Sequence, residues 1–217
     1  MTTHEDDVEK TMQHNRQLRF VDQREHIHIE GKKLPHWSQC DCVQFVTFRL
    51  ADSLPQLKLM EYKKARERWV NAHPKPWTRS EQEEYDDLFG AAIDKWLDAG
   101  HGECLLKDKR ARDIVASVIM NDDGSRCDIY VVAIMPNHVH ILMTPREDYT
   151  VQTIVGSWKS LSSHRINGML NRVGSVWERE SFDRMVRDAA DFTRYVQYIA
   201  ANPQHLPAEW FTLMTCL

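Results

Sequence analysis

The chain has 217 residues, of which 42% are hydrophobic, and this length and composition suit one domain with a hydrophobic core. No run approaches the ~18 consecutive apolar residues of a membrane-spanning helix, and the charged N-terminus predicts no secretory signal. The net charge of −4 is uneven, because residues 78–98 carry seven acidic and two basic residues. Such a balance neither excludes nor indicates a nucleic-acid partner.

The cysteines bear on the cellular compartment. They lie at positions 40, 42, 104, 127 and 216. An odd number without the regular spacing of a disulfide framework favours reduced thiols, and we therefore expect a cytoplasmic protein with no membrane partner.

The first half of the chain contains one strand and two helical segments. Residues 1–33 are charged and lack periodicity, so we interpret them as an N-terminal arm that is partly mobile. Residues 42–50 are dense in β-branched and aromatic side chains and predict the first strand, and a helix follows it. Thr78 and Glu81 form a capping-box signal, so we expect an inserted, acidic helix at 78–98.

The second half alternates between helical and extended segments. The predicted elements are a helix at 109–121, a strand at 126–135, a hairpin partner starting at His138, a helix at 151–170, an extended segment at 176–186 and a helix from Asp188 to Asn202. This order suits an α+β, ferredoxin-like fold with an antiparallel sheet and helices on one face. The strand that starts at His138 would lie centrally in that sheet.

The most informative stretch is Met135-Pro-Asn-His-Val-His-Ile-Leu-Met-Thr-Pro145. Successive side chains of a strand point to opposite faces, so His138 and His140 share one face. Two imidazoles on one rigid strand can hold a divalent metal ion, although such a pair can also be structural. The same spacing at His26 and His28 is flanked by charged residues rather than by a core strand, so we expect no metal role there.

The last predicted helix carries a second set of candidate residues. Tyr198 and Asn202 are four residues apart and therefore lie on the same flank of this helix. Placed beside the histidines, they would add a phenol and an amide oxygen, leaving positions on Mg²⁺ or Mn²⁺ for phosphate oxygens and water. The metal would polarise a phosphodiester while Tyr198 attacks phosphorus. The residues alone leave open a simpler alternative, a half-buried tyrosine and an asparagine that ends a helix.

Two segments resemble the single-tyrosine transposases that carry a His-hydrophobic-His signature. Pro136-Asn-His-Val-His-Ile-Leu142 is similar to that signature, and Tyr198-Ile-Ala-Ala-Asn-Pro203 resembles the tyrosine motif of the REP-associated branch. Supporting similarities lie at residues 34–37, 45–52, 157–160 and 176–184. The resemblance covers roughly residues 30–203, and its order and spacing make it more specific than any single motif.

The resemblance implies that residues 34–203 form a transposase domain that cleaves and rejoins single-stranded DNA near REP-type hairpins. It matches Tyr198 to the nucleophile that becomes linked to a 5′-phosphate, His138 and His140 to metal ligands, and Asn202 to the residue that completes the site. It further implies Mg²⁺ or Mn²⁺ as cofactor, a bacterial, nucleoid-associated protein, and a monomer or homodimer. Tyr195 is the rival nucleophile, but no Asn-Pro pair follows it at the matching distance.

Basic residues that flank the catalytic segments are candidate contacts to DNA phosphates. They are Lys159, Arg165, Arg179, Arg184 and Arg187. Each could equally be a solvated surface charge. The acidic segment at 78–98 would repel DNA, so we expect it away from the DNA groove. The family usually continues after Asn-Pro with a basic residue and glycine, which this chain lacks, and we interpret residues 204–217 as a C-terminal tail.

Two other functions remain open at this stage. A catalytically silent protein with the same fold could bind DNA hairpins as a regulator, although the presence of Tyr198, both histidines and Asn202 argues against lost activity. A nucleotide hydrolase of the histidine-triad kind would need a third alternating histidine, where this chain has Leu142.

Overall fold

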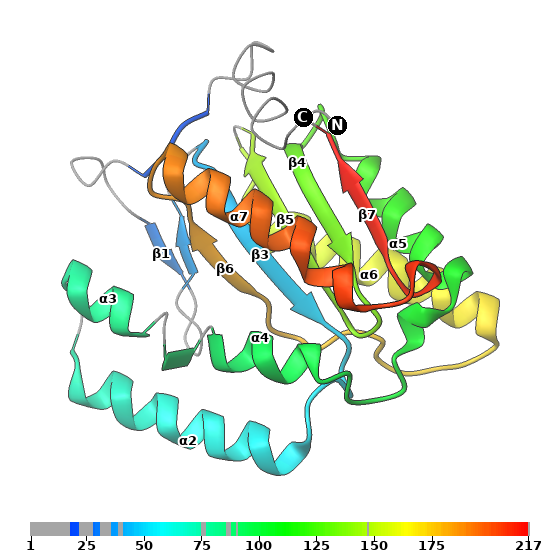
Figure 1. The fold of residues 1–217 in the computed structure, drawn as a ribbon, viewed down its shortest axis with the longest axis horizontal. Helices are drawn as coiled ribbons and strands as arrows, with labels where there is room; N and C mark the ends of the chain where they lie inside the picture. Colours follow the sequence, from blue (N-terminus) through cyan, green and yellow to red (C-terminus); the bar gives the residue numbers. More distant parts are fainter. Residues whose placement is uncertain are drawn as a thin grey trace.

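The computed structural model describes residues 18–21, 28–30, 36–38, 41–74, 77–85, 88–89, 91–146 and 148–216. Its centre is a five-stranded sheet with the strand order β6-β3-β5-β4-β7, in which every pair is antiparallel (Figure 1). The strands are β3 (Gln44–Arg49), β4 (Cys127–Ile134), β5 (His138–Pro145), β6 (Phe182–Met185) and β7 (Thr212–Thr215). The strand that begins at His138 lies in the centre, as the sequence predicts.

Two helices cover one face of this sheet. They are α5 (Lys109–Met120) and α6 (Val151–Leu170), and β3, α5, β4, β5, α6 and β6 follow each other as in a ferredoxin-like fold. Val139 and Ile141 of β5 lie fully buried in the core beneath them. The α+β class and the antiparallel sheet are thus confirmed. Leu161 of α6 lies outside this core and is 49% exposed.

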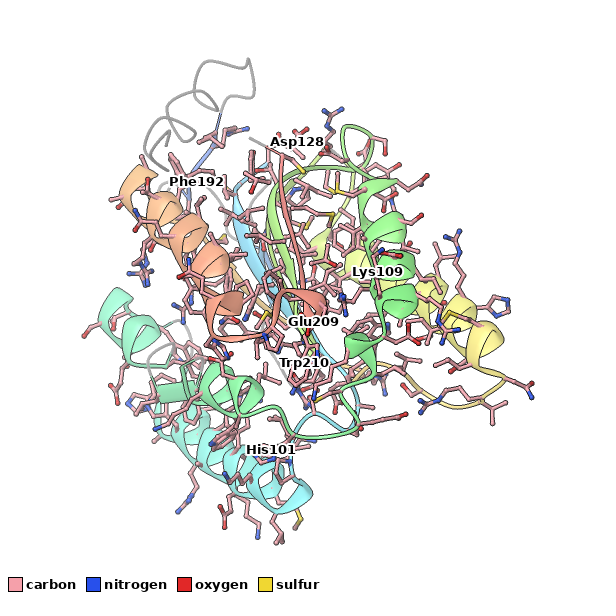
Figure 2. All side chains as sticks on the ribbon, turned by 45° about the vertical axis from the view of Figure 1, so that its right-hand side comes forward. His101, Lys109, Asp128, Phe192, Glu209 and Trp210 are labelled. Carbon is pink, nitrogen blue, oxygen red and sulfur yellow. The ribbon has the colours of Figure 1, made fainter. Side chains whose placement is uncertain are left out.

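The last helix, α7 (Ala189–Ala201), packs on the opposite face of the sheet (Figure 1). Phe192, labelled on α7 in Figure 2, is fully buried and joins a core that includes Phe45 and Leu142. Helices therefore cover both faces, rather than the single face expected from the sequence. The physical reason is that apolar side chains from the strands also point to this second face and need cover from water.

Among the described residues, three α-helices lie between β3 and α5. They are α2 (Gln56–Ala72), α3 (Arg79–Tyr85) and α4 (Ala91–Asp98), so the segment expected as one helix at 78–98 contains two described helices. The capping box exists: the Thr78 backbone N–H donates to Glu81 Oε2 over 2.7 Å, and the Glu81 N–H donates to Thr78 Oγ1 over 3.3 Å. This inserted segment has its own aromatic cluster of Trp69, Trp77, Tyr85 and Phe89.

Most of the predicted N-terminal arm, including His26, lies outside the described residues. The part that is described includes β1 (His28–Glu30), which pairs with β2 (His36–Ser38) in a separate two-stranded sheet. The backbone of Arg19 also accepts a hydrogen bond from the Val43 N–H over 2.9 Å. In the part of the chain that the structure describes, no helix combines the length and apolar character needed to span a bilayer.

The segment expected as a C-terminal tail contributes to the sheet, because β7 pairs with β4. Glu209 and Trp210, labelled in Figure 2, precede this strand. The buried guanidinium of Arg112 on α5 donates to the backbone carbonyl of Glu209 and, over 2.7 Å, to that of Leu106. An edge strand of four residues is too short to give a clear periodic pattern, so only its partners reveal it.

Candidate active site

The alternation of β5 brings His138 and His140 onto the same face, as predicted. Their Nε2 atoms lie 3.1 Å apart and their ring centroids 4.6 Å apart. The two side chains are 1% and 0% exposed, and they point toward α7 because the residues between and after them fill the core on the other face. Two imidazole nitrogens thus converge at one buried point.

Asn137 fixes the tautomer of His138. Its side-chain Nδ2 donates to the carbonyls of Leu97 and His101 over 3.1 and 3.2 Å, which orients the amide and turns Oδ1 toward His138. An amide oxygen only accepts, so the His138 Nδ1 that lies 2.8 Å away carries the proton. The Nε2 atom of His138 therefore presents a lone pair.

Thr47 supports the second histidine from the neighbouring strand β3. Its Oγ1 lies 2.8 Å from His140 Nδ1, on the face that both residues share through the β3–β5 register. With a lone pair on His138 Nε2, the His140 Nε2–H donates to it and the Thr47 hydroxyl donates to His140 Nδ1. A hydroxyl can equally accept, so His140 can move its proton to Nδ1 and expose a second lone pair without losing Thr47.

Burial keeps both histidines neutral. Loss of hydration lowers the pKa of His140 to about 3, and it lowers the pKa of His138 well below the ordinary value, with the neighbouring His140 adding to the shift. Neutral imidazoles are the form that binds metal ions. The pair is therefore in its metal-binding form at physiological pH.

Tyr198 of α7 lies against His140. Its ring lies edge-on to that of His140, with 5.4 Å between centroids, and 5.9 Å from the ring of Phe45. Tyr195 instead stacks on Phe45 at 4.5 Å, and its hydroxyl accepts a hydrogen bond from Arg184 over 3.1 Å. Burial also raises the pKa of Tyr195. The geometry therefore favours Tyr198 over Tyr195 as the phenol of the site.

Asn202 caps the C-terminal end of α7. Its Nδ2 donates to Asp98 of α4 over 3.4 Å, and its Oδ1 is buried with no hydrogen-bond partner among the described residues. Leu97, next to Asp98, accepts from Asn137. The end of the acidic segment thus contacts both Asn137 and Asn202. Its net charge alone could not reveal this contact, because single residues make it. That the segment lies away from the DNA groove stays a prediction.

The donor set fits a divalent metal ion. Two neutral imidazoles and a buried amide oxygen that lacks a hydrogen bond are nitrogen and oxygen ligands of the kind that Mn²⁺ and Mg²⁺ accept. Within the described ranges, no group of three or more His, Cys, Asp and Glu side chains could hold such an ion. A metal ion here would therefore rely on Asn202 and on oxygens from the substrate.

The predicted DNA-contacting residues do not all lie near this site. Arg184 of β6 is paired with Phe45 in the sheet register and so lies on the histidine face. Arg165 is exposed on α6, which covers the opposite face. Lys159 donates to the carbonyls of Glu178 and Arg179 over 3.3 and 2.7 Å, and burial lowers its pKa, so it holds the loop before β6.

The remaining two candidates lie on either side of β6. Arg179 is exposed, whereas Arg187 is partly buried and its backbone N–H donates to Asp191 over 3.2 Å. The sequence analysis did not identify Thr47 as a partner of His140, nor Asn137 as the residue that orients His138. Only the strand register could have indicated Thr47, because it lies opposite His140 across β3 and β5.

A ferredoxin-like sheet with paired histidines facing a tyrosine-bearing helix defines the class of this site. Residues 104–202 match the model of the family described as "Transposase IS200 like". The matched segment contains both histidines, Tyr198 and Asn202, and over it the resemblance to the single-tyrosine transposases is confirmed. This is a family of DNA-cleaving enzymes. No curated protein matches the sequence at a significant level.

Two solved structures are similar to the chain. A REP-associated tyrosine transposase bound to a REP hairpin is 15% identical, with a TM-score of 0.45, and the match covers 81% of this chain and 74% of that one. A proposed transposase from Deinococcus radiodurans R1 is 11% identical, with a TM-score of 0.33, and the match covers 74% of this chain and 89% of that one.

Proposed function

We propose that this protein is a transposase that cleaves and rejoins single-stranded DNA at REP-type hairpins through a covalent bond between Tyr198 and a 5′-phosphate. The observation that carries the proposal is the contact between the Tyr198 ring and His140, whose Nε2 converges with that of His138. A phenol, two neutral imidazoles and an amide oxygen are the groups that such a transesterification needs in one place.

Each residue has a separate role in this proposal. The Tyr198 oxygen attacks phosphorus and loses its proton, while the bond from phosphorus to O3′ breaks and O3′ leaves as a hydroxyl. His138, His140 and Asn202 would hold Mg²⁺ or Mn²⁺. When bound, the ion would neutralise charge on the phosphate and polarise it. The Tyr–phosphate ester retains the energy of the phosphodiester, so a 3′-hydroxyl can reverse the step.

The sheet and α7 fix the orientation of the histidines and of Tyr198. The histidines stand on the central strand of the sheet, and Tyr198 stands on a helix whose first turn is fixed by Asp188, which accepts from the Asp191 N–H over 2.8 Å. The sequence predicts that this helix starts at Asp188, and the start is confirmed, since Asp188 is the N-cap of α7. Rigid elements on both sides of the phosphate favour in-line attack.

The test is covalent capture of DNA. The protein is incubated with a hairpin oligonucleotide that carries a single-stranded flank, in Mg²⁺ or Mn²⁺, and adducts are scored on a denaturing gel. We expect adducts with the unmodified protein and with Tyr195→Phe, and none with Tyr198→Phe, which should still bind the hairpin. Adducts that persist in Tyr198→Phe would falsify the assignment of the nucleophile.

The same experiment separates the alternative functions. A catalytically silent regulator would bind the hairpin without forming adducts in any variant. A histidine-triad-like hydrolase would release product from a small nucleotide and form no tyrosine adduct with DNA. Leu142 at the place of the third histidine, buried beneath α7, disfavours the hydrolase.

A further inference from the structure

A pocket opens between the edge of the sheet and the inserted helices. The pocket is open to solvent, and the space between its lining residues, including this open side, is about 610 Å³. Its floor comes from β3 and β6 of the sheet, and its outer wall comes from α2 and α4. Because α2 and α4 lie outside residues 104–202, this wall belongs to the inserted segment rather than to the matched family segment.

The pocket adjoins the histidine site through β3. Thr47, which is 2.8 Å from His140 Nδ1, also lines the pocket. Arg49, a second lining residue, stands opposite His138 in the β3–β5 register. The pocket and the histidine pair therefore lie on either side of Thr47.

The lining combines positive charge with aromatic rings. Arg49 is held by Glu178, with 3.1 Å between Nη2 and Oε2, and it also donates to Ser53 Oγ. Beyond that neutral pair, the pocket carries the cations Lys63 and Arg66 against the single carboxylate of Glu180. The local balance thus favours an anionic ligand.

Two rings complete the lining, those of Tyr62 on α2 and Phe182 on β6. Tyr62 is fixed edge-on to Phe89 and Trp96, with ring centroids 5.7 and 6.0 Å away. Burial raises the pKa of Tyr62, so its phenol stays neutral and does not repel a phosphate. Cations beside aromatic surfaces are the combination that holds single-stranded nucleic acid, one base on a ring and one phosphate on a cation.

We propose that this pocket binds one nucleotide of the single strand that flanks the scissile phosphate. Lys63 and Arg66 contact its phosphate, its base packs against Tyr62 and Phe182, and Glu180 accepts a hydrogen bond from an exocyclic amino group. The ligand is thus a nucleotide with an amino-bearing base in preference to thymine. The inference rests on the proposed function, because it takes single-stranded DNA as the substrate of the adjoining histidine site.

The chain offers a matched pair of variants for the test. Lys63 lines the pocket, whereas the adjacent Lys64 does not, and both side chains are exposed on α2. Binding of the flanked hairpin is measured by fluorescence anisotropy for Lys63→Glu and Lys64→Glu. We expect Lys63→Glu to weaken binding about tenfold and to lower the salt dependence by about one phosphate contact, with Lys64→Glu within about twofold of the unmodified protein.

Hairpins with an abasic site at successive positions of the single-stranded flank then show which base the pocket binds. In the unmodified protein, removing one particular base should weaken binding by about 5- to 150-fold, and thymine there should bind less well than adenine or cytosine. In Phe182→Ala the same abasic site should cause little further loss, because the two changes remove one contact. Equal effects of the two lysine variants, or additive losses in Phe182→Ala, would overturn the pocket.

The two proposals fail separately. Covalent adducts formed by the unmodified protein report on Tyr198, whereas the difference between the lysine variants is an equilibrium measurement that needs no cleavage. Adducts together with identical lysine variants would reject the pocket alone. A clear lysine difference without adducts would reject the transesterification and leave a strand-binding pocket.

Discussion

The two faces of the sheet use the same strands for opposite purposes. Toward α5 and α6, β5 presents Val139, Ile141 and Met143, each fully buried in an apolar core. Toward α7 it presents His138 and His140, equally buried but polar. The period of two along a strand lets one segment supply stability to one layer and chemistry to the other.

The polar face is stable only because each histidine is supported. An unpaired buried polar group costs on the order of 1–3 kcal/mol. Asn137 meets Nδ1 of His138, Thr47 meets Nδ1 of His140, and the two Nε2 atoms meet each other. The apolar face needs only complementary shape, whereas the histidine face needs a hydrogen-bond partner for each ring nitrogen. These partners come from two segments, β3 and the start of β5.

The sharpest test of this division compares two adjacent residues of β5. His140→Ala should reduce adduct formation by at least about 100-fold, because it removes one of the two imidazole nitrogens that converge at the site. Ile141→Ala should lower the free energy of unfolding by about 2–5 kcal/mol and Tm by roughly 2–4 °C per kcal/mol. Its adduct formation at low temperature, where it remains folded, should stay near that of the unmodified protein.

Urea unfolding and denaturing gels measure the two quantities on the same samples. The division between the faces is wrong if Ile141→Ala, still folded, loses adduct formation as fully as His140→Ala does.

Acid should destabilise the folded protein through the histidine face rather than through the apolar face. His140 has a pKa of about 3 in the folded protein, against an ordinary value of 6.5. Between pH 3 and pH 6.5 this residue is therefore protonated in the unfolded chain and neutral in the folded protein. Stability in EDTA should therefore be fully present above pH 6.5 and fall as the pH drops toward 3, by up to about 1.4 kcal/mol per pH unit for this residue. Urea midpoints across this range measure the slope, and His140→Gln should flatten it, whereas an unchanged slope in that variant would contradict the assignment.

Local sequence signals predicted much of this molecule. The shared face of His138 and His140, the bounds of α6 and the N-cap at Asp188 are each set by residues within a few positions. The contact between Thr47 and His140 joins residues 93 positions apart, and no periodic pattern states which strands will pair.

The edge strands of the sheet and the contacts at the end of the inserted segment also could not be predicted from local sequence patterns. The strands β6 and β7 have four residues each, too few for a strong pattern, and their partners define them. The acidic segment at 78–98 looked unsuited to a DNA site by its charge. Two of its last residues, Leu97 and Asp98, nevertheless contact Asn137 and Asn202, a consequence of tertiary packing rather than of composition.

The smallest effect we predict concerns Asn137, which links this inserted segment to the histidine face. Asn137→Ala leaves His138 free to adopt the other tautomer and should weaken Mn²⁺ binding by about 10- to 100-fold, as measured by calorimetry. Because Asn137 orients a ligand and is not one itself, excess Mn²⁺ should restore adduct formation in Asn137→Ala.

His140→Ala is the control for this rescue, because it lacks a ligand and excess Mn²⁺ should leave it inactive. Equal rescue of the two variants would mean that Asn137 does not act through His138. If only Asn137→Ala recovers, the hydrogen bonds from its amide to Leu97 and His101 make the end of the inserted segment part of the metal site. The histidine face then extends to the inserted segment, whereas the apolar face packs mainly against α5 and α6.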